Sequence, residues 1–491
     1  MPCVDQGTGF TLKLLRWCCA LLTLLAGGFV VAIAIRGSAR PIVLNQSLAS
    51  GAMLLVALAV TGLFLLGAFL PDPSWRSLMG VAAQWRSFQL ERDRTRWFVP
   101  VLVVLLLCQG AILWRLVGAN VQAVDDQADY LRVAREIREL GGSGYVVDLF
   151  SGRFLEDNRH PIYCVLLACH PSFTLGKYLS AFFGMLVTLV AALFAESRFG
   201  ATAGVLTAAL LAVNGALAAS SSLVACESLL TLLVTFAWMQ LCWGGMRTPH
   251  GAMGIGATFG LGYLTKASAF FPLVITFLHA LVVGDRGLAR RLVPASLLVV
   301  GFVVISLPLL VRNIRAYGSP LHSFNTKLLF ADSFDEGRAE PDLGTINNAR
   351  HYWSRHGAGG TLRRLGEGLV VEGFVLVRSL GPVPLESARA IPGSFLFAIA
   401  IVTMLVDREG GLRGRLLFWW LLFFWGFFGW YLPIATSDRF TVPLVPALLV
   451  AASWGVVRGV RVFLEERMTQ RIALVGAVAY GLLFAMWTIV G

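Results

Sequence analysis

The chain has 491 residues, of which 57% are hydrophobic and only 14% are charged, and its mean hydropathy is +0.73. Soluble domains carry about a quarter charged residues, so this composition excludes an ordinary water-soluble protein and predicts an all-α bundle of membrane-spanning helices. The net charge of +12 does not indicate nucleic-acid binding, because Lys and Arg cluster in short loops between apolar segments.

Apolar segments recur along the whole chain. A spanning helix needs roughly 20 predominantly apolar residues, and on this criterion we predict about thirteen spans. They are residues 14–36, 48–70, 98–118, 176–196, 202–219, 222–243, 250–265, 267–284, 292–311, 391–406, 416–435, 441–457 and 472–490. The first follows Lys13 and Arg16 as in a signal peptide, but its apolar run is long enough for a retained helix.

These spans divide the chain into four parts. Residues 1–97 hold two N-terminal spans and a basic loop, and residues 98–311 hold a central membrane module with a long polar loop at 118–175. Residues 312–392 form a second long loop, and residues 393–491 hold the C-terminal spans. Loops of this length inside a polytopic protein are more often functional than not.

The basic loops predict how the chain is oriented. Arginines gather between the second and third spans and after the eighth, tenth and twelfth spans. All these loops lie on one face, and the positive-inside rule makes that face, and the N-terminus, cytoplasmic. Both long polar loops are then extracytoplasmic.

The first long loop contains an amphipathic pattern that begins with two acids, Asp125 and Asp126. Tyr130, Val133 and Ile137 recur at helical spacing, which predicts a helix suited to the membrane surface. Asp is a favoured N-cap, and the helix dipole stabilises a carboxylate there, so capping is one interpretation. Because a cap needs only one acid, the other is available as a general base or a cation ligand.

Further polar residues are predicted at the outer ends of spans. They are Asp157, Arg159, His160, Tyr163, Glu227, Lys266, Arg312 and Arg439. Each cation alone is explained as an interfacial anchor, but ionisable residues at membrane depth are costly and usually functional. Together they predict a site for a phosphorylated lipid headgroup, in which cations hold the phosphate while a carboxylate activates an acceptor.

Six short motifs occur in order between residues 98 and 457. They are Asp126-Gln-Ala-Asp-Tyr130 with Ala134; Arg159-His-Pro-Ile-Tyr163; Glu227-Ser-Leu; Gly262-Tyr-Leu-Thr-Lys266; Leu307-Pro-Leu-Leu-Val-Arg312-Asn313 with Gly318-x-Pro320; and Asp438-Arg439-Phe440 with Pro443 and Pro446. This succession resembles the GT-C class of multi-spanning glycosyltransferases, in particular bacterial relatives of protein mannosyltransferases and lipid A aminoarabinose transferases.

The resemblance implies a GT-C-like fold and an inverting enzyme that transfers sugar from a polyprenyl-phosphate donor to a lipid, glycan or protein acceptor. It implies a bacterial inner-membrane protein whose site faces the periplasm. The expected catalytic residues are Asp126, its nearest substitute Asp125, and Glu227. The expected donor-phosphate ligands are Arg159, Lys266, Arg439 and Arg312, and the expected supporting residues are Tyr130, Asp157, His160 and Tyr163.

The chain departs from the family pattern at several points. Two spans precede the usual first one, His160 replaces a proline, and Asn158 stands where some relatives carry Glu. A divalent cation on Asp125, Asp126 and Asp157 stays open, since hard cations prefer oxygen ligands. A polysaccharide polymerase or ligase, and a transporter or flippase for lipid-linked sugars, are the alternative functions; neither mid-span charges nor inverted repeats favour the transporter.

Overall fold

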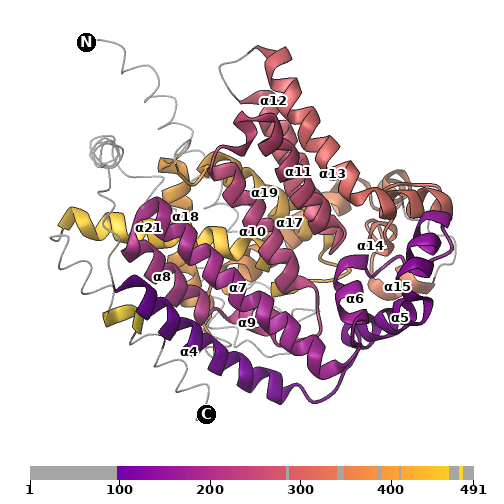
Figure 1. Cartoon of the computed structure of the whole chain (residues 1–491). Coiled ribbons are helices and arrows are strands. Elements are labelled where there is room, and N and C mark those ends of the chain that lie inside the picture. Colours follow the sequence, from indigo (N-terminus) through magenta and orange to yellow (C-terminus); the bar gives the residue numbers. More distant parts are fainter. Residues whose placement is uncertain are drawn as a thin grey trace, which may run out of the picture.

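The computed structural model describes residues 97–283, 287–339, 348–383, 389–407, 411–463, 475–478 and Gly481. Within these ranges the chain is a helical bundle without strands, apart from one isolated bridge between Asn214 and Pro382 (Figure 1). The two predicted N-terminal spans and most of the predicted last span lie outside the described residues. The all-α prediction is confirmed for the described part of the chain.

Four described segments are long and apolar enough to cross a membrane. They are Phe98–Ala119 (α4), Phe173–Phe199 (α7), Arg291–Tyr317 within α13 (Leu288–Tyr317), and Asp438–Arg461, which contains α20 (Asp438–Thr441) and most of α21 (Val445–Phe463). The remaining bundle helices are α8 (Ala201–Ala212), α9 (Gly215–Ser221), α10 (Glu227–Cys242), α11 (Pro249–Tyr263), α12 (Phe270–Val282), α18 (Ala390–Val406) and α19 (Gly414–Tyr431). The protein is therefore an integral membrane protein.

The helices follow the predicted spans with two informative differences. The predicted span 202–219 is two helices, because the Asn214 side chain caps α9 by accepting from the Leu217 N–H at 2.9 Å. The predicted span 222–243 becomes helical only at Glu227, since residues 222–226 form a turn.

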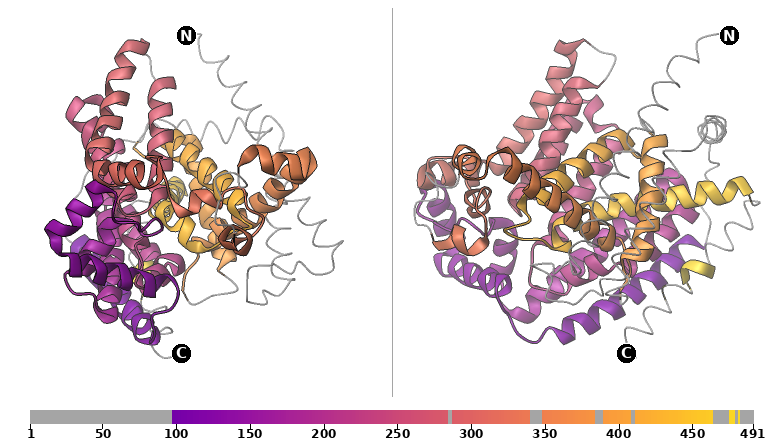
Figure 2. Two further views of the ribbon diagram at one scale, coloured as in Figure 1. Left: turned by 90° about the vertical axis from the view of Figure 1, so that its right-hand side faces the viewer. Right: turned by 180° about the vertical axis from the view of Figure 1, so that it is seen from behind.

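The bundle has one large apolar core to which most of its helices contribute. In Figure 2 the orange and yellow C-terminal helices pack against the magenta helices from the middle of the chain. α11 and α13 approach most closely where Gly256 and Gly260 face the backbone of α13, since a side chain at either position would collide with it. Small residues at such contacts are typical of membrane helices.

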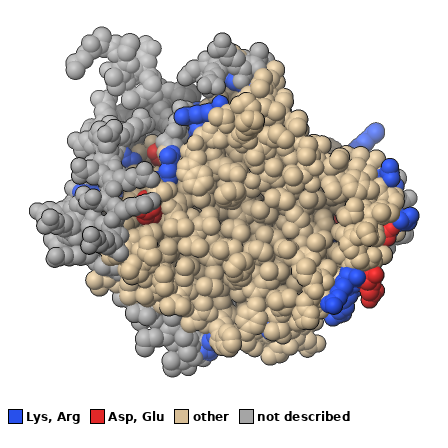
Figure 3. All heavy atoms as spheres, in the orientation of Figure 1, with Lys and Arg blue, Asp and Glu red and all other residues tan. Residues whose placement is uncertain are grey.

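The bundle exposes a wide surface without charge. Leu107 and Trp114 of α4 are 67% and 69% exposed, and Val304 of α13 is 54% exposed. In the face shown in Figure 3, Lys, Arg, Asp and Glu are confined to the rim. A soluble monomer rarely exposes so large an apolar area, whereas lipid requires one.

Helices that are not among the predicted spans gather at one end of the bundle, on the right in Figure 1. They are α5 (Asp126–Ser151), α6 (Pro161–Ala168), α14 (Phe324–Lys327) and α15 (Phe334–Ala339), and the long helix α17 (Ala349–Ser379) leads back towards the bundle. The predicted helical face of Tyr130, Val133 and Ile137 is buried in a cluster with α6 and the turn before α10. The apolar side of α5 therefore packs on the protein.

Candidate functional site

Asp126, the first residue of α5, lies between two guanidinium groups. Arg159 Nη2 is 2.5 Å from Asp126 Oδ1 and 3.2 Å from Asp129 Oδ2, and Arg439 Nη1 binds the other oxygen of Asp126. Burial alone raises the pKa of Asp126, but the charges of Arg159 and Arg439 outweigh it and hold the pKa below its ordinary value. Asp126 is therefore an ionised carboxylate at neutral pH.

The turn before α6 presents Arg159 to this carboxylate. Glu156 Oε1 accepts hydrogen bonds from the backbone N–H groups of Asn158 and Arg159 at 3.0 and 2.9 Å. The Arg159 guanidinium lies 4.9 Å above the centroid of the Tyr130 ring, and its side chain is only 8% exposed. Backbone hydrogen bonds and a cation–π contact thus fix the cation in place.

A second ion pair adjoins the first. Lys266 Nζ is 2.7 Å from Glu227 Oε1, and Glu227 Oε2 is buried without a hydrogen-bond partner. The Lys266 ammonium and the Arg439 guanidinium lie over the same Phe440 ring, at 5.5 and 5.3 Å from its centroid. Phe440 therefore joins the two pairs into one carboxylate–cation cluster, which we define as Asp126, Asp129, Arg159, Glu227, Lys266 and Arg439.

Gln127 holds the starts of α5 and α10 together. Its Oε1 accepts from the Val224 N–H at 3.0 Å and from Asn120 Nδ2 at 2.9 Å. Two helix N-termini, each with a positive dipole end, consequently face the same cluster. Lys177 completes this scaffold by donating to the Val117 and Asn120 carbonyls at the end of α4, at 2.8 and 2.5 Å.

Arg439 is positioned by the residue before it. Asp438 accepts two hydrogen bonds from Arg378 of α17, at 3.1 and 3.0 Å, and lies 3.5 Å from Arg389. A bidentate arginine–carboxylate pair restricts orientation as well as distance. The sequence did not indicate the role of Arg378, because its partner lies 60 residues away.

The structure places four of the expected site residues beside the cluster rather than in it. Arg312 is buried and donates to the Phe154 and Glu156 carbonyls, so it holds the loop that precedes Arg159. The imidazole of His160 donates to the Tyr263 carbonyl. The Tyr163 hydroxyl binds Ser180 Oγ at 2.7 Å. Asp157 Oδ2 lies 3.4 Å from His322 Nε2. All four residues therefore make contacts around the cluster and none of them belongs to it.

Asp125 is exposed and makes no capping hydrogen bond, and its φ of 46° is unusual for a residue other than glycine. The three carboxylates considered for a divalent cation, those of Asp125, Asp126 and Asp157, have separate surroundings. Among the described residues no group of three His, Cys, Asp or Glu side chains is arranged to hold a metal ion.

Comparisons with known proteins identify the fold of the chain through solved structures and not through its sequence. No family model matches the sequence, and no curated protein matches it. ArnT from Cupriavidus metallidurans bound to undecaprenyl phosphate aligns with a TM-score of 0.50 and 15% identity over 81% of this chain and 76% of that chain.

Two further structures align less closely. Apo ArnT from the same organism aligns with a TM-score of 0.47 and 15% identity over 79% of this chain and 75% of that chain. An apo Archaeoglobus fulgidus oligosaccharyltransferase aligns with a TM-score of 0.45 and 16% identity over 81% of this chain and 55% of that chain. On the first alignment, the chain has the fold of ArnT, and the predicted resemblance to the GT-C class is confirmed at the level of the fold.

Proposed function

We propose that this protein is a membrane glycosyltransferase that transfers a sugar from a polyprenyl-phosphate donor to an acceptor with inversion at the anomeric carbon. The observation that carries the proposal is the position of Asp126 between Arg159 and Arg439 at one end of a GT-C-like bundle. The ArnT structure with that fold was determined with undecaprenyl phosphate bound. By the predicted orientation, transfer takes place on the periplasmic face of a bacterial inner membrane.

The cations of the cluster suit a lipid phosphate. Arg159 and Arg439 each keep a buried Nε–H without a partner, and Lys266 lies close by on the Phe440 ring. Guanidinium groups bind phosphate oxygens through charge-assisted hydrogen bonds, and helix N-termini add favourable dipoles. Arg159, Arg439 and Lys266 would hold the donor phosphate.

Donor binding would also prepare the base. Both guanidinium groups are engaged by Asp126, which lowers the pKa of Asp126 and makes it a weak base. A phosphate that draws Arg159 and Arg439 towards itself weakens these ion pairs. The pKa of Asp126 would then rise only when a donor is bound. Asp126 would act as a base only on an acceptor that meets a bound donor.

The proposed reaction is a single displacement. Asp126 takes the proton of an acceptor hydroxyl or amine as that atom forms a bond to the anomeric carbon. The bond between the anomeric carbon and the phosphate oxygen breaks, and its electron pair stays on the phosphate. Polyprenyl phosphate leaves with its charge stabilised by Arg159, Arg439 and Lys266.

Sugar transfer in proteoliposomes tests the proposal. Labelled polyprenyl-phosphate sugars are supplied with a membrane extract as acceptor, and wild type is compared with Asp126→Asn. Loss of a general base typically costs 10²–10⁴-fold, so transfer should fall by about that factor while folding and donor binding are retained.

Asp125→Asn is the matched comparison, because Asp125 is the adjacent acid and lies outside the ion pairs. Normal transfer by Asp126→Asn together with loss in Asp125→Asn would assign the base to Asp125. If wild type moves lipid-linked sugar across the bilayer without transferring it, the protein is a flippase and the proposal fails.

A further inference from the structure

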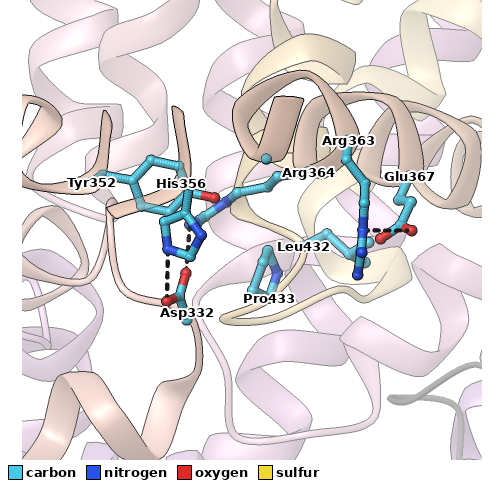
Figure 4. A pocket seen from close by; sticks show the side chains of 9 residues that line it. Asp332, Tyr352, His356, Arg363, Arg364, Glu367, Leu432 and Pro433 are labelled. Atoms are coloured by element: carbon cyan, nitrogen blue, oxygen red, sulfur yellow. Dashed lines mark hydrogen bonds and ion pairs between the residues drawn. The ribbon is translucent and has the colours of Figure 1, made fainter. Parts of the chain in front are cut away.

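A cavity of about 280 Å³ lies outside the carboxylate–cation cluster, between the segment before α15, the first half of α17 and the residues after α19. Figure 4 shows Asp332 and His356 on one side, Arg363 and Glu367 on the other, and Leu432 and Pro433 between them. Its volume is just below the range of roughly 300–1,000 Å³ for small-molecule sites, which suits a single ring better than a longer ligand.

The back wall of this cavity is preformed. Arg364 is buried and donates to the carbonyls of Ala331 at 2.9 Å and Trp430 at 3.0 Å. Its guanidinium lies over the rings of Trp430 and Tyr352, at 4.4 and 4.9 Å from their centroids. A wall fixed by hydrogen bonds and stacking costs little ordering entropy when a ligand binds.

The wall carries charged groups of both signs, the carboxylates of Asp332 and Glu367 and the guanidinium groups of Arg363 and Arg364. Asp332 Oδ2 lies 3.0 Å from His356 Nε2 and also binds Arg355, and Arg363 lies 3.3 Å from Glu367. A sugar hydroxyl donates and accepts at once, so paired carboxylate and guanidinium groups satisfy it on both counts. A phosphate would require an excess of cations, and an extended peptide would require a groove or a free strand edge.

Two hydrogen bonds run between a residue that adjoins the cavity in the chain and a residue that adjoins the cluster. Tyr431, directly before Leu432, donates to Asn325 Oδ1 at 3.0 Å, and Asn325 Nδ2 donates to Asn158 Oδ1 at 3.4 Å. Asn158 directly precedes Arg159, the partner of Asp126. The Tyr431 ring also meets the Phe440 ring edge-on at 6.5 Å. The loop that carries Arg159 and the residues after α19 that line the cavity are therefore in contact through Asn325, and none of the proposed phosphate ligands lines the cavity.

We propose that this cavity binds a carbohydrate ring of the acceptor, so that the acceptor is a glycan or a glycolipid. The inference rests on the proposed function, because only sugar transfer at the cluster makes a neighbouring sugar site an acceptor site. Asp332 and Glu367 are the carboxylates that would bind hydroxyl groups, and Arg363 supplies the donor beside them.

The test uses the full chain in nanodiscs, with maltose and chitobiose as probes in saturation-transfer NMR. Both Asp332 and Glu367 are partly exposed, at 37% and 47% of the side chain, so Asp332→Asn and Glu367→Gln should fold. We expect wild type and Asp126→Asn to bind at least one probe, and the double variant to bind at least tenfold more weakly. Glu139→Gln, an exposed substitution on α5, is the matched control.

Binding of undecaprenyl phosphate and transfer to a membrane extract are measured on the same samples. We expect the double variant to keep its lipid affinity and kcat and to raise the KM for the acceptor at least tenfold, as removal of ground-state binding does. Lipid binding without probe binding, or probe binding unchanged in the double variant, would overturn the acceptor site and leave the proposed function intact. Wild type that binds probe but not lipid would overturn both.

Discussion

A carboxylate held between two guanidinium groups is a weak base, because both cations stabilise its ionised form. Asp126 is in this position, and its partners come from residues 33 and 313 positions away in the chain. At the residue scale the proposed chemistry would therefore depend on how a donor phosphate competes for Arg159 and Arg439. The sequence predicted Asp126, Arg159, Lys266 and Arg439 at one membrane level, and the structure brings them together.

Arg439→Gln should weaken the binding of undecaprenyl phosphate by about 10- to 100-fold, since a hydrogen bond to a charged group contributes ~1.5–3 kcal/mol. The side chain is 40% exposed, so folding should be preserved. Lipid binding to protein in nanodiscs measures the effect, with Arg138→Gln on the exposed face of α5 as control. Equal affinities of Arg439→Gln and wild type would remove Arg439 from the phosphate site.

His160 should make the protein less stable in mild acid. Burial lowers its pKa from 6.5 to about 4, with a smaller contribution from Arg312 and Lys266, so the fold favours the neutral ring. An unfolded chain takes up the proton first, and stability present above pH 6.5 is lost as the pH falls towards about 4. The full loss is about 3 kcal/mol, since one pKa unit corresponds to ~1.4 kcal/mol.

Thermal unfolding between pH 7 and pH 4.5 measures this loss. His160→Gln keeps an amide donor for the Tyr263 carbonyl but does not titrate, so its unfolding temperature should fall less steeply over the same range. Parallel curves for the two proteins would show that His160 is not the titrating group.

What residue-level sequence reasoning could not supply was the direction of long side chains. Arg312 lies at the predicted membrane level, yet its guanidinium turns to two backbone carbonyls. Glu227 and Lys266 were each assigned to the site, but their mutual ion pair depends on the packing of α10 against α11. The catalytic and phosphate-binding roles stay predictions until they are measured.

At the scale of elements, apolar length predicted most helices within a few residues. The misses have local causes: a polar cap at Asn214 divides one predicted span, and the loop 312–392 contains the 31-residue helix α17. The first half of α17 is polar, so the search for runs of about 20 apolar residues did not predict this helix. This helix supplies Arg378, which fixes α20 and with it Arg439.

Arg378→Lys should lower transfer by about 10- to 100-fold, because a single ammonium cannot hold Asp438 by two parallel hydrogen bonds and a displacement of ~1 Å has costs of this size. A positioning role predicts that kcat falls while the unfolding temperature changes little. Arg350→Lys, exposed at the other end of α17, is the control. A fall in unfolding temperature that accounts for the lost activity would indicate a purely structural role.

At the scale of the whole molecule, loops were predicted to alternate between the two faces of the membrane, and the contacts between segments agree with this grouping. Segments predicted on the outer face meet in the cluster, and segments predicted on the opposite face also meet. Arg198 donates to the Cys242 carbonyl at 3.2 Å, and Trp238 Nε1 donates to the Leu412 carbonyl at 3.1 Å. Which of the two ends is cytoplasmic is a prediction from charge alone.

Thiol labelling of intact cells tests that orientation. In a chain without other cysteines, Arg138→Cys on α5 should react with a membrane-impermeant reagent, and His250→Cys in the first turn of α11 should react only after lysis. Both positions are exposed. The reverse pattern would place the carboxylate–cation cluster in the cytoplasm and contradict the predicted topology.

The pairing of Asp126 with Arg439 has a consequence for biosynthesis. The acid is made early and its second cation 313 residues later, so α5 and α10 are synthesised long before both cations that pair with Asp126 are present. Until α20 arrives, Asp126 has only Arg159 to balance it. A chain interrupted before residue 438 could assemble most of its helices and would still lack one of its proposed phosphate ligands, so on the proposed function the ability to bind a lipid-linked substrate would arise only near the end of translation.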